Sequence, residues 1–458
     1  MIPPNILNEI ADIVGSENLE TGHDGLKEYA SDGTKLEFMP EAVVFPGNSE
    51  EISKILILAN REHFPVIPRG AGSGMSGGAL PVMKGLVMVM DRFDRIISID
   101  QDNLIAKLEP GVITAHFQKE VARLDLFYPP DPASAEISTI GGNVAECAGG
   151  LRAVKYGVTR DYILGLTVVL PTGEIIRTGV ETAKGVAGYD LTRLIIGSEG
   201  TLAVITSITL RLIPKPKSKK TMTAFFRDLP AAVNTVSHII REKVVPAALE
   251  FLDRQCIECV REEMGVDIPD EAGSMLLIEV DGDPFIIKRE MEKIRDISKA
   301  RGAIEFRTAS NEDEAENLWL ARRNASPSLM RLGPDKISED VVVPRSRLAE
   351  LVSFLEELGA RNGLAIPSFG HAGDGNLHVN IMLNKENPDE MNRAQKVIRE
   401  LFLKVVEMGG TITGEHGVGI TKAPYMELEL SRPALDLMVR LKKAFDPNGI
   451  LNPGKMSL

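Results

Sequence analysis

PRGAGSGMSGG, residues 68–78, follows a short apolar run at residues 65–67 and is rich in glycine. Because glycine has no Cβ, the backbone N–H groups of such a loop can converge on a phosphate. The spacing of Gly72, Gly74 and Gly77 fits the dinucleotide fingerprint, but Ala79-Leu80-Pro81 interrupts the helix that should follow. No Gly-Lys-Ser/Thr closes the loop, which excludes a P-loop. The loop alone is compatible with a phosphate cradle or a plain turn.

Two later stretches strengthen the cradle interpretation. One runs from Ser138-Thr139-Ile140-Gly141-Gly142-Asn143 through Ala148-Gly149-Gly150 to Tyr156-Gly157. The other, Gly197-Ser198-Glu199-Gly200-Thr201, precedes a long alternating strand. Three separated loops of small residues can enclose an extended ligand, so we expect this part of the chain to bind a whole dinucleotide.

The composition is that of a globular protein with two or three domains: 458 residues, 43 % hydrophobic and 26 % charged. The net charge of −13 argues against nucleic acid as a partner. No run of about 18 apolar residues predicts a membrane span, and no signal peptide is apparent. We therefore expect a cytoplasmic protein that meets a membrane only through a partner. Three cysteines are too few for a disulfide framework or an iron–sulfur set of its own.

Apolar periodicity predicts a strand at 42–46, a helix with Ser49 as its N-cap, and a second strand before the glycine loop. The Pro- and Lys-rich stretch 214–220 separates this region from a second one, in which strands alternate with helices and predict an α+β sheet domain. The expected domains are a helical segment at 1–37, a cofactor domain at 38–216 and a substrate domain at 217–458.

Two histidine motifs point to a metal. His371 and His378 flank a turn with Asp374-Gly375 at its tip, and a hairpin there would bring the two imidazoles together. With the carboxylate of Glu415 they would form a three-ligand site for Zn²⁺, Mn²⁺ or Fe²⁺, with open positions for substrate. Asn380 shares a strand face with His378. The alternative is a polar turn whose histidines only make hydrogen bonds.

Six motifs occur in a fixed order along the chain: PRGAGSGMSGG (68–78), GGNVAECAGGLRAVKYG (141–157), GSEGTL (197–202), GHAGDGNLHVN (370–380), GEHGVG (414–419) and NPGK (452–455). Together they resemble the FAD-linked flavoproteins of the vanillyl-alcohol oxidase superfamily, within the group that includes D-lactate dehydrogenases, D-2-hydroxyglutarate dehydrogenases and the flavoprotein component of glycolate oxidase. The resemblance implies an α+β fold. It would have a two-subdomain PCMH-type FAD-binding domain, an α+β cap domain with an antiparallel sheet, and a C-terminal segment that returns to the FAD.

The resemblance also assigns cofactor residues. Those expected at FAD are Arg69, Gly70, Ala71, Gly72, Ser73, Gly74, Met75, Gly77, Gly78, Pro132, Ser138, Thr139, Gly141, Gly142, Asn143, Ala145, Gly149, Gly150, Tyr156, Gly157, Gly200, Ile205 and Asn452. Relatives with covalent flavin often carry histidine at the position of Ser73, so non-covalent FAD is expected. Relatives often have asparagine where this chain has Cys147.

The resemblance also implies that His416 would be the catalytic base and that His371, His378 and Glu415 would bind the metal. Arg322 and Lys336 match cations that bind the substrate carboxylate, with Ser326 as a further donor and Asn380 nearby. Arg322 could instead be a surface residue of its helix.

The expected function is metal- and flavin-dependent oxidation of a small D-2-hydroxy acid, D-lactate or glycolate, to the 2-oxo acid. Hydride would pass to flavin N5, and the electrons would leave to an iron–sulfur partner subunit, an electron-transfer flavoprotein or a quinone. D-2-hydroxyglutarate is the alternative substrate, and a non-catalytic FAD-holding electron-transfer subunit is the alternative role. Ether formation, as in alkylglycerone-phosphate synthases, leaves no evident use for the histidine motifs.

Overall fold

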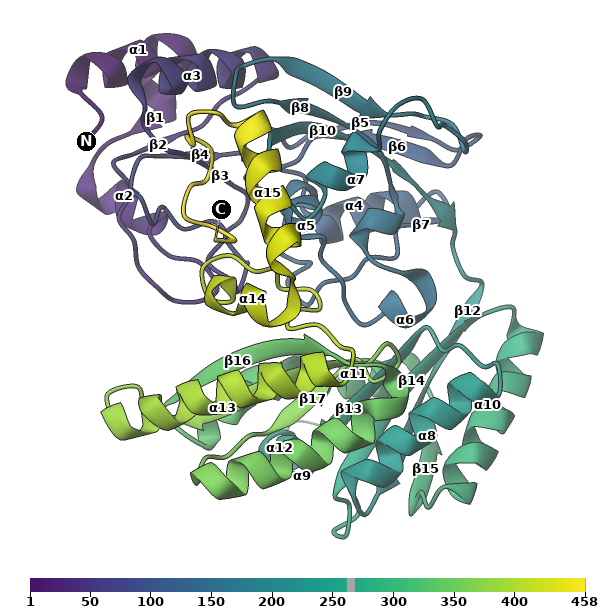
Figure 1. The fold of residues 1–458 in the computed structure, drawn as a ribbon. Coiled ribbons are helices and arrows are strands. Elements are labelled where there is room, and N and C mark those ends of the chain that lie inside the picture. Colours follow the sequence, from purple (N-terminus) through teal and green to yellow (C-terminus); the bar gives the residue numbers. More distant parts are fainter. Residues whose placement is uncertain (262–267, 458) are drawn as a thin grey trace. The chain divides into compact units, whose positions relative to one another are not determined.

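In a computed structural model the chain folds as two compact units (Figure 1). Each unit has its own hydrophobic core. The structure describes residues 1–261 and 268–457. The segments of unit 1 are 1–149, 158–215 and 415–458, and those of unit 2 are 150–157 and 216–414.

Unit 1 begins with a small mixed sheet. Its elements are α1 (Pro4–Val14), η1 (Ser16–Asn18), β1 (Leu19–Glu20), α2 (His23–Glu28), β2 (Ala42–Val44), α3 (Ser49–Glu62), β3 (Val66–Arg69) and β4 (Leu86–Val89). The strand order is β1-β2-β4-β3, and β2 and β3 both run parallel to β4. The predicted strand–helix–strand unit is therefore present, with β4 inserted between its two strands.

The N-cap of α3 differs from the prediction. Asn48, rather than Ser49, caps the helix, because its side chain accepts a hydrogen bond from the Glu51 N–H. Asparagine caps a helix about as well as serine does, so the choice depends on where the chain leaves the extended conformation. Apolar residues of α1 and α3 cover one face of the sheet, and Leu26 of α2 packs on the other.

The remaining strands of unit 1, between residues 96 and 214, pair in an antiparallel arrangement. The elements of this region are β5 (Ile96–Asp100), β6 (Ile105–Leu108), α4 (Thr114–Ala122), β7 (Leu126–Phe127), α5 (Ile140–Glu146), η2 (Thr159–Asp161), β8 (Ile163–Val169), β9 (Ile175–Gly179), α7 (Leu191–Ile195), β10 (Val204–Arg211) and β11 (Ile213–Pro214). Five of the strands form a sheet in the order β5-β6-β10-β8-β9, and β7 pairs with β11. The helix α5 ends at Cys147 with a left-handed φ of 57°. Asparagine adopts this conformation more readily than most residues, which gives a backbone reason for asparagine there in relatives.

The last segment returns to unit 1. It contains η5 (Ala423–Tyr425), α14 (Met426–Glu429) and α15 (Arg432–Phe445). After α15 the chain lies beside β3: the Val66 N–H donates to the Ile450 carbonyl, and the Asn452 N–H donates to the Val66 carbonyl. A buried ion pair fixes this return, because the Lys442 ammonium donates to the Asp446 carboxylate, which in turn accepts the Ile450 N–H.

Unit 2 is built on one antiparallel sheet. Its elements are α6 (Ala153–Tyr156), β12 (Ser218–Phe226), α8 (Leu229–Arg241), β13 (Ala248–Asp253), α9 (Arg254–Val260), β14 (Ser274–Gly282), α10 (Pro284–Ala300), β15 (Glu305–Thr308), α11 (Glu312–Ser328), η3 (Leu329–Arg331), β16 (Asp335–Val342), η4 (Arg345–Arg347), α12 (Leu348–Asn362), β17 (Ser368–Gly370), β18 (Asn376–Leu383) and α13 (Pro388–Glu407). The strand order is β15-β12-β14-β13-β17-β18-β16, with every pair antiparallel.

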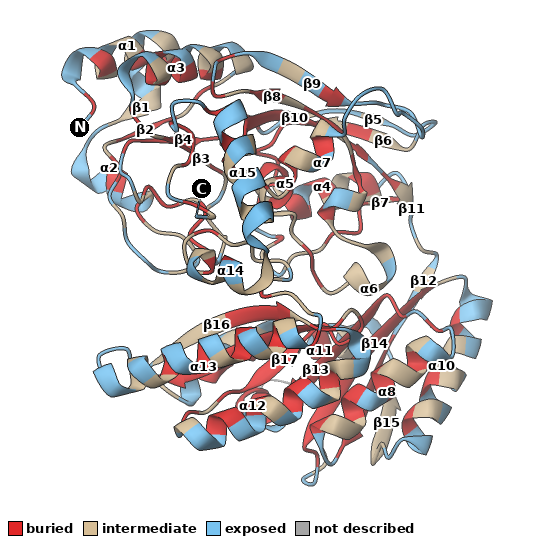
Figure 2. Cartoon of the chain, viewed as in Figure 1, coloured by how far each residue is buried: buried red, intermediate tan, exposed pale blue. Residues whose placement is uncertain are grey.

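Helices cover both faces of this sheet. One face packs against α8, α10, α12 and α13, while α9 and α11 pack on the other around Phe225, Leu252 and Trp319. Figure 2 shows the central strands buried along most of their length, whereas the covering helices alternate between buried and exposed residues. This is the side-chain pattern of amphipathic helices on a sheet.

The predicted fold class is confirmed: a mixed α+β chain with a cofactor-type unit, an antiparallel cap sheet and a returning C-terminal segment. Within residues 1–261 and 268–457, no helix combines the length and the apolar character needed to cross a membrane.

Replacing Asp446 by Asn should lower the free energy of unfolding by about 3–5 kcal/mol, because it leaves the buried Lys442 charge without its carboxylate. Asp436→Asn is the matched control. Asp436 pairs with Arg432 on the same helix at the same four-residue spacing, but both side chains are exposed, so the expected cost is below about 1 kcal/mol. Urea unfolding followed by circular dichroism measures both variants. Equal losses would contradict the anchoring role of the buried pair.

Candidate functional site

A cavity of about 230 Å³ in unit 1 is lined by the glycine-rich loop and the two later small-residue stretches. The predicted FAD residues that line it are Arg69, Gly70, Ala71, Gly72, Ser73, Gly74, Met75, Gly78, Pro132, Ser138, Thr139, Gly141, Gly142, Asn143, Ala145, Gly149, Gly200 and Ile205. Glu146, Glu199, Glu415 and His416 also line the cavity. Three stretches distant in sequence therefore border one cavity, as the motif analysis predicts.

The loop is suited to an anion. Within the described part of the chain, no backbone N–H from Ala71 to Gly78 donates a hydrogen bond. Of these residues, Ser76, Gly77 and Gly78 are buried. Buried N–H groups require acceptors, and a pyrophosphate offers several. The Arg69 side chain is held by the Ser31 carbonyl, to which its Nη2 donates a hydrogen bond at 2.8 Å. Burial lowers the pKa of the Arg69 guanidinium. Gly72 has a φ of 67° and lies against that guanidinium, where a Cβ would clash.

Five predicted FAD residues lie outside this lining. Gly150, Tyr156 and Gly157 belong to unit 2, where the Tyr156 hydroxyl donates to Asp281 at 2.7 Å. Gly77 packs against Ile420. Asn452 acts indirectly: its amide donates to the carbonyls of two lining residues, Gly78 and Glu199. The chain enters unit 2 after Gly149, and contact of Gly150, Tyr156 and Gly157 with FAD stays a prediction.

Two acidic residues of the lining, Glu146 and Glu199, were not predicted from the sequence. Glu199 accepts the N–H groups of Val418 and Gly419 at 2.6 and 2.7 Å, so it holds the segment that follows His416. Glu146 Oε2 is buried and has no hydrogen-bond partner among the described residues. Burial, together with the neighbouring Glu199, raises the pKa of Glu146 well above its ordinary value, and burial raises that of Glu199 as well. An acidic residue inside a glycine-rich motif is the only sequence signal for either one.

In unit 2, polar side chains occupy one face of β16 and β18. The register pairs Ser338 with Asn380 and Asp340 with His378. The Ser338 hydroxyl donates to Asn380 Oδ1 at 2.8 Å, and Lys336 Nζ donates to the Ser326 carbonyl at 2.7 Å and to its hydroxyl. Lys336 and Ser326, predicted separately, are thus in direct contact.

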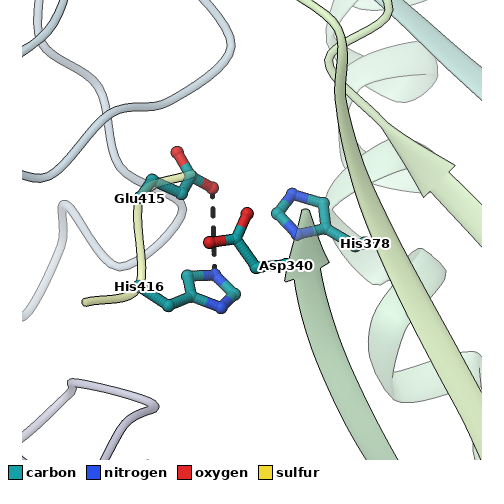
Figure 3. A group of neighbouring side chains, drawn as sticks. All are labelled: Asp340, His378, Glu415 and His416. Carbon is teal, nitrogen blue, oxygen red and sulfur yellow. Dashed lines mark ion pairs between the residues drawn. The ribbon is translucent and has the colours of Figure 1, made fainter. Parts of the chain in front are cut away.

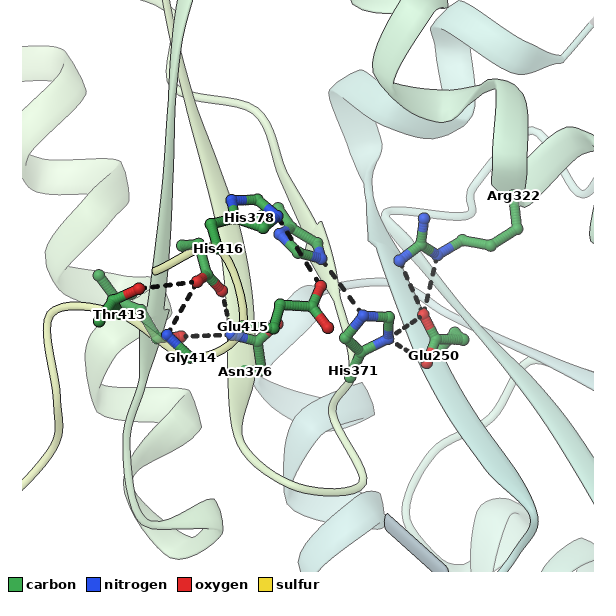
Figure 4. A network of polar contacts seen from close by, with 11 residues as sticks. Glu250, Arg322, His371, Asn376, His378, Thr413, Gly414, Glu415 and His416 are labelled. Carbon is green, nitrogen blue, oxygen red and sulfur yellow. Dashed lines mark hydrogen bonds and ion pairs between the residues drawn. The ribbon is translucent and has the colours of Figure 1, made fainter. Parts of the chain in front are cut away.

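His371 and His378 meet as the hairpin predicts. Their Nε2 atoms are 3.3 Å apart and their rings are nearly perpendicular (Figure 4). The β-ladder pairs His378 with Phe369, so His371 reaches it from the loop after β17 rather than from the opposite ladder position. Both imidazoles are at most 9 % exposed.

A buried glutamate, absent from the sequence prediction, connects this pair to Arg322. Glu250 on β13 is fully buried and accepts from His371 Nδ1 at 2.8 Å. It also accepts from Arg322 Nε at 3.0 Å (Figure 4). The Arg322 guanidinium lies over the Phe369 ring, 4.6 Å from its centroid. Arg322 is therefore a buried, paired residue of α11 and not a surface arginine. The signal available in the sequence is a single charge within the apolar strand AALEFL.

Asp340 positions the chain just before Glu415 and His416. It is fully buried, and its carboxylate accepts the Gly414 N–H at 2.8 Å and the Asn376 amide. Glu415 follows Gly414 directly, and its Oε1 is 3.8 Å from His416 Nε2 (Figure 3). Asp340 was not predicted either, because its nearest sequence neighbours form an ordinary strand.

Comparison with known proteins gives a consistent result. Residues 40–179 match the model of an FAD binding domain, and residues 215–456 match the C-terminal domain of FAD linked oxidases. The chain is 47 % identical over 457 residues to the glycolate oxidase subunit GlcD of Bacillus subtilis, covering 100 % of this chain and 97 % of that protein. It is 35 % identical to a D-lactate dehydrogenase of Anaerostipes hadrus, covering 97 % and 94 %. Among solved structures, p-cresol methylhydroxylase shares the fold with a TM-score of 0.80 at 18 % identity, covering 99 % and 96 %.

Replacing Glu199 by Ala should speed hydrogen exchange at the Val418 and Gly419 amides by about tenfold or more, because each loses a buried acceptor. Glu109→Ala is the control. It removes another buried glutamate of unit 1, one that is paired with Arg95. Exchange measured by mass spectrometry on peptides that span residue 418 gives the comparison. Unchanged exchange in Glu199→Ala would show that this segment is held in some other way.

Proposed function

The chain belongs to the family of FAD-linked oxidases, and we propose that it oxidises a small D-2-hydroxy acid, D-lactate or glycolate, to the 2-oxo acid. The substrate class comes from relatives named for glycolate and D-lactate. The observation that carries the proposal is the buried His371–His378 pair on the same sheet face as Glu250, which holds Arg322. The two imidazoles can serve as ligands of a metal ion, and Arg322 offers a cation for the substrate carboxylate.

The cavity of unit 1 fits FAD. Its unpaired N–H groups from Ala71 to Gly78 suit the pyrophosphate, and Ser73 offers no imidazole for covalent attachment, so the cofactor is proposed to be non-covalent. Bound FAD supplies a two-electron acceptor for the substrate hydride. The residues of unit 1 hold and orient this cofactor.

His371, His378 and Glu415 are proposed to bind a divalent ion, Zn²⁺, Mn²⁺ or Fe²⁺. Two nitrogen ligands of a tetrahedral zinc ion lie about 3.3 Å apart, which is also the separation of the two Nε2 atoms. Glu415 follows Gly414, which is fixed to Asp340 on the same sheet. Such an ion supplies a Lewis acid for the hydroxyl and one carboxylate oxygen of the substrate.

The side chains have distinct proposed roles. Arg322 binds the substrate carboxylate, and Lys336 with Ser326 adds a second cation and a hydroxyl on the same sheet face. Asn380 lies beside His378 and orients the substrate. His416 takes the proton from the substrate hydroxyl, a role suited to an imidazole at neutral pH.

Electrons are proposed to leave through a partner, such as an iron–sulfur subunit, an electron-transfer flavoprotein or a quinone. One relative is named as a subunit. The three cysteines of this chain are too few for a four-cysteine cluster, and Cys256 and Cys259 are buried within the core of unit 2.

Adding D-lactate or glycolate to the purified protein without oxygen should bleach the flavin absorbance. His416→Ala should keep FAD bound but slow this reduction by about 100-fold or more, because the hydroxyl proton then has no acceptor. His238→Ala is the control, since among the described residues that half-buried histidine of α8 bonds only the Asn234 carbonyl of its own helix. Stopped-flow absorbance measures all three proteins.

Other results would redirect the proposal. Bleaching by D-2-hydroxyglutarate alone would make that acid the substrate. A bound flavin that no hydroxy acid reduces, but that still exchanges electrons with dyes, would favour the non-catalytic electron-transfer role.

Removing divalent ions with a chelator should abolish flavin reduction by the hydroxy acid while leaving FAD bound, because of the three proposed ligands only Glu415 lines the FAD cavity. Titration with Zn²⁺, Mn²⁺ or Fe²⁺ should restore reduction and identify the ion. Dithionite, which needs no substrate site, is the control and should bleach the flavin in every sample. Full activity after metal depletion, with metal content verified by mass spectrometry, would refute the metal site.

A further inference from the structure

Glu250 is a buried charge in an otherwise apolar strand. On β13 it is flanked by Leu249 and Phe251 and is fully buried. Both of its carboxylate oxygens lie within hydrogen-bond distance of His371 Nδ1, at 2.8 and 2.9 Å. One of them, Oε2, also receives Arg322 Nε at 3.0 Å and Nη2 at 2.7 Å. Burial of a charge is costly, so both partners are needed to compensate it.

We propose that Glu250 is a positioning residue: it fixes His371 in the tautomer that carries its proton on Nδ1 and holds Arg322 in place. In this role a single carboxylate sets the geometry of a metal ligand and of the cation for the substrate carboxylate. The inference rests on the proposed function for the metal role of His371, but the tautomer itself does not depend on a metal.

The tautomer follows from donor and acceptor chemistry. A carboxylate paired with arginine only accepts hydrogen bonds, so His371 Nδ1 must be the donor. In the neutral imidazole this leaves a lone pair on Nε2, which faces His378 Nε2 at 3.3 Å. A histidine that ligates through Nε2 commonly donates its other N–H to a carboxylate, which orients the ring and raises its basicity. Glu250 meets this description for His371.

The same carboxylate limits how Arg322 can move. Glu250 engages Nε and Nη2, and the guanidinium face lies over Phe369 at 4.6 Å. Nη1 is not engaged by Glu250, so one corner of the guanidinium keeps its donors for an anion. A planar cation held on one edge and one face loses less rotational freedom on binding a carboxylate.

Glu250→Gln tests this geometry at nearly constant volume. Both neighbours of residue 250 are donors, whereas glutamine offers one oxygen and one NH₂ group, so one donor must face another. Glu279→Gln is the matched control. Glu279 lies on the adjacent strand β14, is 4 % exposed, and contacts Lys219 and Thr221 instead of the histidine.

The first measurement is the imidazole ¹⁵N spectrum of metal-free, histidine-labelled protein, with His371 assigned by the signal lost in His371→Gln. The wild type and Glu279→Gln should show His371 with Nδ1 protonated and Nε2 unprotonated, and Glu250→Gln should show a mixture of tautomers. A proton on Nε2 in the wild type would overturn the inference, and that result needs no variant to fold. Retention of the wild-type tautomer in a folded Glu250→Gln protein would overturn it equally.

The second measurement is calorimetric titration of the metal-free FAD-loaded protein with Zn²⁺. Glu250→Gln should bind about 10–100-fold more weakly than the wild type, with Glu279→Gln close to the wild type. Tight wild-type binding that Glu250→Gln leaves unchanged would overturn the positioning role while keeping the proposed function. Absence of Zn²⁺ binding by the wild type would instead remove the metal part of the proposed function, and the tautomer would still decide whether Glu250 orients His371.

Discussion

A buried charge on a sheet face needs a hydrogen-bonding partner directly beside it, and this constraint determines how the elements of unit 2 are arranged around the sheet. Glu250 is matched by Arg322 and His371, and Asp340 by the Gly414 N–H and the Asn376 amide. Three of these partners join the sheet to other elements: Arg322 to α11, His371 to the loop after β17, and Gly414 to the segment that leads to Glu415. The buried carboxylates Glu250 and Asp340 therefore determine where the elements around the sheet lie, which an entirely apolar core would not do.

In unit 1 the partners of a buried carboxylate are backbone N–H groups. Glu199 is satisfied by two N–H groups, whereas the glycine loop presents N–H groups that no described residue accepts. The first arrangement stabilises the protein by itself, and the second is complete only when an anionic cofactor supplies the acceptors. FAD should therefore contribute to the stability of unit 1 as well as to its chemistry.

The sequence predicted the architecture well because its signals are local. Strand and helix periodicity, the glycine loop and the hairpin between His371 and His378 each lie within a few residues. Glu250 could not be found in this way, since 121 positions separate it from His371 and nothing in its own strand indicates a partner. Tyr156 is a second case: its predicted role came from a neighbouring glycine motif, whereas its hydroxyl bonds Asp281, 125 positions away. Long-range pairing of buried polar groups is decided by the packed structure and not by local pattern.

The return of the C-terminal segment also has a consequence for synthesis on the ribosome. β3 is hydrogen-bonded to residues 450–452, so this edge of the sheet stays unpaired until residue 452 has been made. The seven-stranded sheet of unit 2 draws its strands from residues 218–383 alone, so translation supplies it earlier. During synthesis the sheet of unit 2 can therefore form while β3 of unit 1 still lacks its partner. Domains usually fold in the order in which they are translated, and here that order is reversed.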